Sequence, residues 1–210
     1  MTAREQILDS VRAALGSGPD RHRAAPAVRI SVPERTPDAR IEMFFSAISN
    51  LAGKPYQATS PTDACRHVAG ILDGQPAVAS NAPFLRECGI TGLASVQTGF
   101  TDSGALRQAC ATAAAGITCA HYALADTGTL VMLASPEEAR LISLLPPSHI
   151  AVVPQARIIT GLDELFSLVP QPGELTSSMV LITGPSRTAD IEQILVRGVH
   201  GPGEIHIVVV

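Results

Sequence analysis

The sequence of 210 residues contains no tryptophan, and only 3% of its residues are aromatic. This scarcity argues against binding of single-stranded nucleic acids, whose bases stack on aromatic side chains. An excess of positive charge is also missing, since the net charge is −4 and the isoelectric point is near 5.8. The chain therefore has no general attraction for phosphate polymers, and we predict no nucleic-acid partner.

Cysteine residues are few, and their spacing does not indicate a metal site. The four cysteines include no C-x-x-C pair, and they match no zinc or iron–sulfur box. The residues around Cys65 and Cys110 are typical of buried helical positions. We predict that the chain carries no metal and no cluster of its own.

Long apolar runs are absent as well. No run approaches the roughly 18 residues that a membrane-spanning helix needs. The first residues, MTAREQILDSV, contain acidic side chains and lack the apolar stretch of a signal peptide. These features predict a cytoplasmic protein without a membrane span.

What the chain does contain is a large aliphatic fraction, with 46% hydrophobic and 16% charged residues. Residues 2–16 have helical spacing, and Thr2 and Glu5 have the spacing of a capping box. A stretch rich in Pro, Ser and Arg follows. We predict an N-terminal helix and extended linker in residues 1–36 and a single α/β domain in residues 37–210. Two alternatives stay open for residues 1–36: they dock onto a partner, or they fold back onto their own domain.

Helical and strand patterns alternate after residue 37, which predicts an α/β fold with a mostly parallel sheet flanked by helices. In such sheets, ligands gather at the carboxyl ends of the strands. The predicted helices cover residues 38–53, 61–74, 83–90, 104–116, 136–146, 162–169 and 188–198. The predicted strands cover residues 76–80, 93–99, 117–125, 129–134, 149–154, 156–160, 178–184 and 204–210.

The first turn that could carry chemistry is D-T-G-T, Asp126 to Thr129. Gly128 permits a positive φ, and the hydroxyls of Thr127 and Thr129 suit either the turn itself or a ligand. Asp126 is a carboxylate between two apolar runs. On local evidence alone, an ordinary hairpin turn is the stronger interpretation.

The second turn, Gly184 to Thr188, lies between a predicted strand and a predicted helix. Free N–H groups at a helix start, together with Ser186, Arg187 and Thr188, suit a carboxylate or a phosphate. The alternative is that Thr188 caps the helix and Arg187 pairs with a neighbouring acid. Local evidence leaves the two interpretations even.

The third turn is the glycine-rich stretch Gly198 to Glu204, which contains His200. A histidine held in such a loop can act as an acid or base or bind an anion. More often it satisfies local backbone groups. His149, at the start of a predicted strand, has the same two interpretations.

Taken together, the segments ADTGTLVML, RLISLLPPSHIAVVP and ITGPSRTADIEQILVRGVHGPGEIHIVVV resemble the lactate-utilization protein C family, whose members have a LUD domain. The resemblance is close over residues 110–210. The family motif A-E-T-G-T falls on residues 125–129, where Asp126 replaces the Glu. The L-L-P-x-x-H element falls on residues 144–149, and the motifs G-P-S-R-T-A-D-I-E and G-V-H-G-P fall on residues 184–192 and 198–202.

The resemblance implies a Rossmann-like fold similar to that of phosphosugar isomerases and CoA-transferases. It also implies a subunit without clusters in a complex that oxidises L-lactate to pyruvate, with the iron–sulfur clusters on partner subunits. The motif turns are then expected to bind a small carboxylate or a nucleotide, with Asp126 and His200 as candidates for proton transfer. The expected ligand-binding residues are Thr127, Gly128, Thr129, His149, Gly184, Ser186, Arg187 and Thr188. A stand-alone isomerase-like or transferase-like enzyme and a non-catalytic regulatory or assembly module are the alternatives.

Overall fold

The computed structural model describes residues 2–15, 33, 35–191 and 194–210, and it divides the chain into two units, residues 1–31 and 32–210. In the first unit, α1 (Ala3–Leu15) confirms the predicted helix. Its capping box is present, because the Thr2 N–H donates to Glu5 Oε2 at 2.7 Å and the Glu5 N–H donates to Thr2 Oγ1 at 3.3 Å. The predicted linker lies largely outside the described residues, and the domain boundary at residue 36 stays a prediction.

A central sheet of six parallel strands confirms the predicted α/β class. Its strand order is β1-β12-β7-β4-β2-β3. The bounds are β1 (Lys54–Gln57), β2 (Ala77–Ala79), β3 (Val96–Gln97), β4 (Ala115–Cys119), β7 (Ser148–Val153) and β12 (Glu204–Val209). Sequence analysis missed β1, which is a short and only partly buried edge strand that contains a proline.

One face of the central sheet is covered by helices α3 (Pro61–Leu72) and α4 (Pro83–Glu87). Ile117, Ile150 and Val208 of the sheet join Val68 of α3 and Leu85 of α4 in one buried cluster. Helix α5 (Ser103–Thr112) adds a smaller cluster beside β2. A parallel sheet needs such cover on both faces, since its strands are apolar on both.

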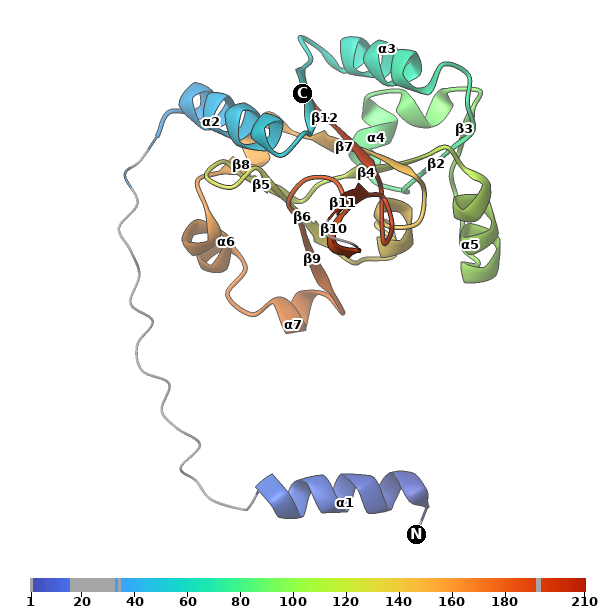
Figure 1. The fold of residues 1–210 in the computed structure, drawn as a ribbon, viewed down its shortest axis with the longest axis vertical. Helices are drawn as coiled ribbons and strands as arrows, with labels where there is room; N and C mark the ends of the chain where they lie inside the picture. The colour runs from blue at the N-terminus through green and yellow to red at the C-terminus, as the bar shows by residue number, and fades with distance from the viewer. Residues whose placement is uncertain (1, 16–32, 34, 192–193) are drawn as a thin grey trace. The chain divides into compact units, whose positions relative to one another are not determined.

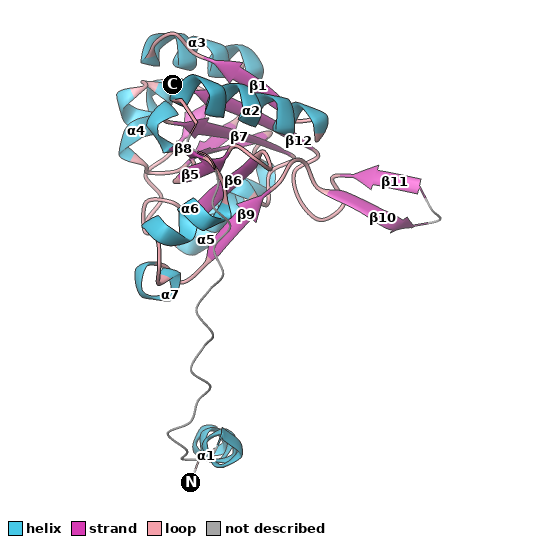
Figure 2. Cartoon of the chain, turned by 90° about the vertical axis from the view of Figure 1, so that its left-hand side faces the viewer, coloured by secondary structure: helices cyan, strands magenta, loops and turns pink. Residues whose placement is uncertain are grey.

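The other face is covered by helix α2 (Pro37–Asn50) and by a second sheet, β8-β5-β6-β9. Phe44 and Ile48 of α2 pack in one buried cluster with Leu130 of the second sheet and Ile207 of the central sheet. Figures 1 and 2 both show α3 and the second sheet on opposite sides of the central strands. The second sheet comprises β5 (Tyr122–Leu124), β6 (Thr129–Leu133), β8 (Ile158–Ile159) and β9 (Met179–Ile182). Helices α6 (Leu162–Leu168) and α7 (Pro172–Leu175) lie between β8 and β9 in the chain.

The strand predicted over residues 117–125 divides between the two sheets. It runs as β4 to Cys119, leaves the central sheet at Ala120 and His121, and continues as β5 in the second sheet. An apolar pattern of period two is the same in either sheet, so the local sequence does not mark the crossing. The predicted helix over residues 136–146 is also reduced, to one 3₁₀ turn at Arg140–Ser143.

The helix predicted over residues 188–198 is wrong. This segment forms an antiparallel hairpin, β10 (Arg187–Ile191) and β11 (Ile194–Arg197), which extends away from the rest of the domain in Figure 2. Thr188, Ile191 and Val196 are β-branched residues, which are enriched in strands and lose side-chain freedom in helices. That preference outweighs the helical spacing of the apolar positions.

Among the described residues, no helix combines the length and apolarity required to cross a membrane.

The turn between β5 and β6 lies directly against α2 at Gly128. A Cβ atom on Gly128 would come within 2.6 Å of the Ile48 backbone nitrogen and 2.9 Å of its Cα, and the φ of Gly128 is +67°. Neither contact can be relieved by a side-chain rotation, because both involve backbone atoms. The glycine is therefore required by packing and by conformation together.

We predict that Gly128→Ala lowers the free energy of unfolding by about 3 kcal/mol, because it adds a steric overlap and a strained φ. The matched control is Gly70→Ala, within α3, where a Cβ atom would meet nothing within 4 Å. That variant is expected to gain about 0.5–1 kcal/mol from the better helix propensity of alanine. Urea unfolding followed by circular dichroism measures both, and equal effects of the two variants would contradict the packing argument.

Candidate functional site

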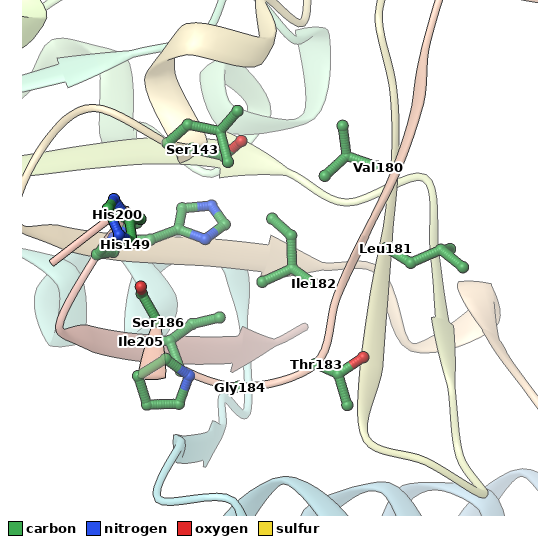
Figure 3. Close-up of a pocket in the computed structure, with 14 residues that line it drawn as sticks. Ser143, His149, Val180, Leu181, Ile182, Thr183, Gly184, Ser186, His200 and Ile205 are labelled. Carbon is green, nitrogen blue, oxygen red and sulfur yellow. The ribbon is translucent and has the colours of Figure 1, made fainter. Parts of the chain in front are cut away.

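A small pocket of about 210 Å³ lies where the second sheet meets the start of β7 and β12. It is lined by residues 143, 144, 149, 180–186, 200–202 and 205. Figure 3 shows the imidazole of His149 extending into this space, with His200 and Ser186 at one side and Ile182 at another. The pocket therefore combines three of the sequence motifs in one place.

This pocket lies at the amino edge of the central sheet, not at the carboxyl edge where ligands were expected. His149 is the second residue of β7 and pairs in register with Gly116 of β4 and Ile205 of β12. A Cβ atom on Gly116 would come within 1.8 Å of the Ile142 carbonyl oxygen, so the segment before β7 lies directly on β4. The motif turns gather here because the second sheet, which carries β9, covers this end of the strands.

The hairpin β10–β11 brings the second and third motif turns together. The Ser186 N–H donates to the Pro202 carbonyl at 2.9 Å, and the Gly198 N–H donates to the Ser186 carbonyl at 3.0 Å. The Gly203 N–H donates to the Pro147 carbonyl at 2.9 Å, which attaches the third turn to the start of β7. A helix over residues 188–198 would have kept these turns apart.

His149 is the most deeply placed polar group of the pocket. Its Nε2 forms a 2.8 Å hydrogen bond with Thr118 Oγ1, whereas its Nδ1 is buried without a partner. Burial lowers the pKa of His149 to about 4, so the ring is neutral at physiological pH. Depending on the tautomer, Nδ1 offers a donor or an acceptor to a ligand; a buried group of this kind is costly to leave unpaired.

The remaining residues of the pocket lining form a polar rim and an apolar wall. His200 is exposed and Ser186 is partly buried, while Ile205 is buried at the base. Apolar side chains of Val180 and Ile182 in β9 complete the wall. Such a site can hold a small molecule that has an apolar end and one group able to form hydrogen bonds.

The D-T-G-T turn lies beside the pocket and contacts its edge through threonine hydroxyls. Thr129 Oγ1 is 2.7 Å from Thr127 Oγ1 and 2.8 Å from Thr183 Oγ1, and Thr183 lines the pocket. Asp126 is exposed and lies against Gly161 instead, outside the pocket lining. The structure thus brings His149, Gly184, Ser186 and His200 together in the pocket lining. Thr129 contacts the lining through Thr183, whereas Asp126 does not reach it.

Arg187 also lies outside the pocket lining. Its Nη2 donates to the carbonyl of Leu51, the C-cap residue of α2, where a positive charge complements the helix dipole. Gly184, with φ +85°, packs against the same Leu51. Thr188 belongs to β10 and so does not cap a helix. Ligand binding by Arg187 and Thr188 stays a prediction.

Sequence analysis did not single out Glu138, which lines a separate and larger cavity. It is 5% exposed, and burial raises its pKa to about 7. Glu138 lies in the first turn of the helix predicted over residues 136–146, next to Glu137, where an acidic side chain is ordinarily exposed. Nothing local marks this carboxyl as buried, because its burial depends on β2 and β4.

All four cysteines are free thiols. Burial raises the pKa of each, to about 12 for Cys119 and about 11 for Cys88. The thiol form is therefore favoured over the reactive thiolate. Within the described part of the chain, no group of three or more His, Cys, Asp or Glu residues is arranged to hold a metal ion.

We predict a pH-dependent stability contribution from His149. Unfolded histidine binds a proton near pH 6.5, whereas folded His149 does so only near pH 4, so stability that is present above pH 6.5 is lost as the pH falls towards 4. Relative to His149→Gln, the native chain should lose about 2 kcal/mol between about pH 7 and pH 4.5.

The comparison with the variant is needed because Glu138, with its raised pKa, changes stability in the opposite direction over this range. Urea unfolding of both proteins at the two pH values provides the measurement. A difference between them that does not change with pH would contradict a buried, neutral His149.

Comparison with known proteins agrees with this architecture. The family model of the LUD domain matches residues 41–210. Lactate utilization protein C of Bacillus licheniformis is 38% identical over 99 residues, which is 45% of this chain and 41% of that protein. Lactate utilization protein C of Halalkalibacterium halodurans is 43% identical over 91 residues, which is 41% of this chain and 40% of that protein. The matched stretch thus spans about two fifths of the length of these relatives.

A crystal structure of a DUF162 family protein from Deinococcus radiodurans has the same fold. It aligns with a TM-score of 0.64 at 17% identity and covers 84% of this chain and 99% of its own. Because the family model matches nearly all of the α/β domain, the chain belongs to the LUD domain family.

Proposed function

We propose that this chain acts in lactate utilization, as the subunit without clusters of an iron–sulfur complex that oxidises L-lactate to pyruvate. The observation that carries the proposal is the identity of about 40% to proteins named lactate utilization protein C. The proposed role in the complex is to bind the small carboxylate at the amino-edge pocket, while the clusters reside on partner subunits.

The dimensions of the pocket support a small acid rather than a nucleotide. Its volume of about 210 Å³ is below the roughly 300–1,000 Å³ of pockets for drug-sized ligands. A three-carbon acid presents one methyl group and a few oxygen atoms. Ile182 lies across the space from the two histidines and provides apolar surface for the methyl group, while Ile205 is the register neighbour of His149 on β12.

The proposed binding mode uses the groups whose hydrogen-bonding capacity the fold leaves available. His149 Nδ1 provides the deep contact, because Nε2 is already bonded to Thr118. The hydroxyl of Ser186 and the ring of His200 provide contacts nearer the rim. Of the two candidates for proton transfer, only His200 lines the pocket, so we assign that role to His200.

Binding of pyruvate and of L-lactate to the purified chain tests this assignment by calorimetry. We expect His149→Gln to weaken pyruvate binding about tenfold, because glutamine can reach Thr118 in place of Nε2 but has no atom in place of Nδ1. His149→Asn is the matched variant, since asparagine keeps an atom near Nδ1 and loses the contact to Thr118. It should keep most of the affinity and lose stability instead.

His67→Ala, on α3 and outside the pocket lining, is the control and should bind like the native chain. If neither acid binds, or if His67→Ala and His149→Gln behave alike, the pocket assignment is wrong.

The role in the complex is tested separately in cells that grow on L-lactate. Deletion of the gene is expected to abolish this growth, and a tagged copy is expected to retain proteins that contain iron–sulfur clusters. Complementation with Ser186→Ala should restore the association but only part of the growth, because the pocket and not the interface is altered. Unchanged growth after deletion, with no cluster protein retained, would contradict the proposal.

A further inference from the structure

The larger cavity, of about 630 Å³, lies at the carboxyl edge of the central sheet. Its lining includes Ala82, Ala120 and Pro154, which follow the carboxyl ends of β2, β4 and β7. Three neighbouring parallel strands therefore end at this cavity. In parallel α/β sheets, this edge is where ligands bind. It is distinct from the amino-edge pocket of the proposed function.

Glu138 provides an unpaired polar group at the wall of this cavity. Its Oε1 accepts hydrogen bonds from Ser80 Oγ at 2.7 Å and from the Cys119 N–H at 2.8 Å, whereas its Oε2 is buried without a partner. Because both donors reach Oε1, the proton of the neutral carboxyl group resides on Oε2. Glu138 lines the cavity, so a ligand held there would supply the missing partner of Oε2 while Oε1 keeps its two hydrogen bonds.

The charged groups that line the cavity are of both signs. Glu87 of α4 and Glu137 line it together with Glu138, so an anion would meet three carboxyl groups. Arg157 lines it as well and interacts with the ring of Tyr122 at 5.5 Å, so an ammonium group would meet a fixed positive charge. A neutral ligand with hydroxyl groups meets neither repulsion, because a hydroxyl group can donate to a carboxylate and accept from a guanidinium.

A hydroxyl group is the neutral group that fits Glu138 best. It donates to Oε2 when the carboxylate is ionised and accepts from Oε2 when the carboxyl group is protonated, and burial raises the pKa of Glu138 to about 7. His121 adds a second polar contact. Its Nδ1 accepts from the Leu133 N–H at 3.2 Å, so its neutral ring carries a hydrogen on Nε2. Phe84 and Ala120 provide apolar surface for a carbon skeleton.

We propose that this cavity is a second ligand site, which binds a neutral compound with several hydroxyl groups, such as a sugar ring, through Glu138. The site stands on its own geometry and does not depend on the role in lactate utilization.

Modification by dicyclohexylcarbodiimide tests the site, because this apolar reagent reacts with protonated carboxyl groups. In the full chain, we expect Glu138 to be labelled at about pH 6 and about thirtyfold less at about pH 8.5, where it is ionised. Peptide mass spectrometry locates the label. Glu138→Gln, which keeps the shape of the side chain, should fold normally and lose this label, whereas Glu42→Gln on α2 should retain it.

The ligand class is tested by repeating the labelling with an excess of D-ribose, of adenosine or of pyruvate. Protection of Glu138 by ribose or adenosine, but not by pyruvate, is the expected result. Absence of labelling at Glu138 would show that the cavity does not give access to the carboxyl group and would overturn the proposal. Labelling that neither ribose nor adenosine prevents would overturn it as well, whatever is found for lactate or pyruvate at the other pocket.

Discussion

The architecture depends on covering both faces of the parallel sheet around β7 and β12. Helices α3 and α4 cover one face, as in many α/β domains, but the other face is shared between α2 and a second sheet. The end of α2 is the point where this second layer is attached, because Gly128 lies against Ile48 and Gly184 lies against Leu51. Gly128 permits close approach to the Ile48 backbone and Gly184 permits close approach to Leu51, which places the strands β6 and β9 over the amino end of the central sheet.

This layer arrangement leaves a cavity at each edge of the sheet, and each cavity has one buried ionisable group whose capacity for hydrogen bonds is not filled by the protein. His149 at the amino edge has its pKa lowered and Glu138 at the carboxyl edge has its pKa raised, in both cases chiefly by burial. Near neutral pH His149 is neutral and Glu138 is partly protonated, so the cost of burying a charge is reduced while one donor or acceptor stays available at each edge. The same physical effect, burial of one incompletely paired ionisable group, thus occurs at both edges of the sheet.

Several elements were predictable from local pattern alone. Apolar periodicity correctly predicted the helices α2, α3, α5 and α6 and the long strands β6, β7 and β12. The spacing of Thr2 and Glu5 correctly predicted the capping box of α1. Where the apolar spacing failed, either a competing local preference or a contact between distant segments was responsible. The helix predicted over residues 188–198 is a hairpin that pairs strand with strand, and the strand over residues 117–125 changes sheets at Ala120 and His121.

By itself, the sequence determined the fold class, the membership of the LUD domain family and the identity of the motif turns, because periodicity and motifs depend on residues that are close in the chain. Only the tertiary structure decided which of these turns share a pocket. It joined Ser186 to Pro202 through the hairpin, placed Asp126 and Arg187 outside the lining, and buried Glu138 between β2 and β4. Those outcomes follow from contacts between distant segments and from burial, which a short stretch of sequence does not encode.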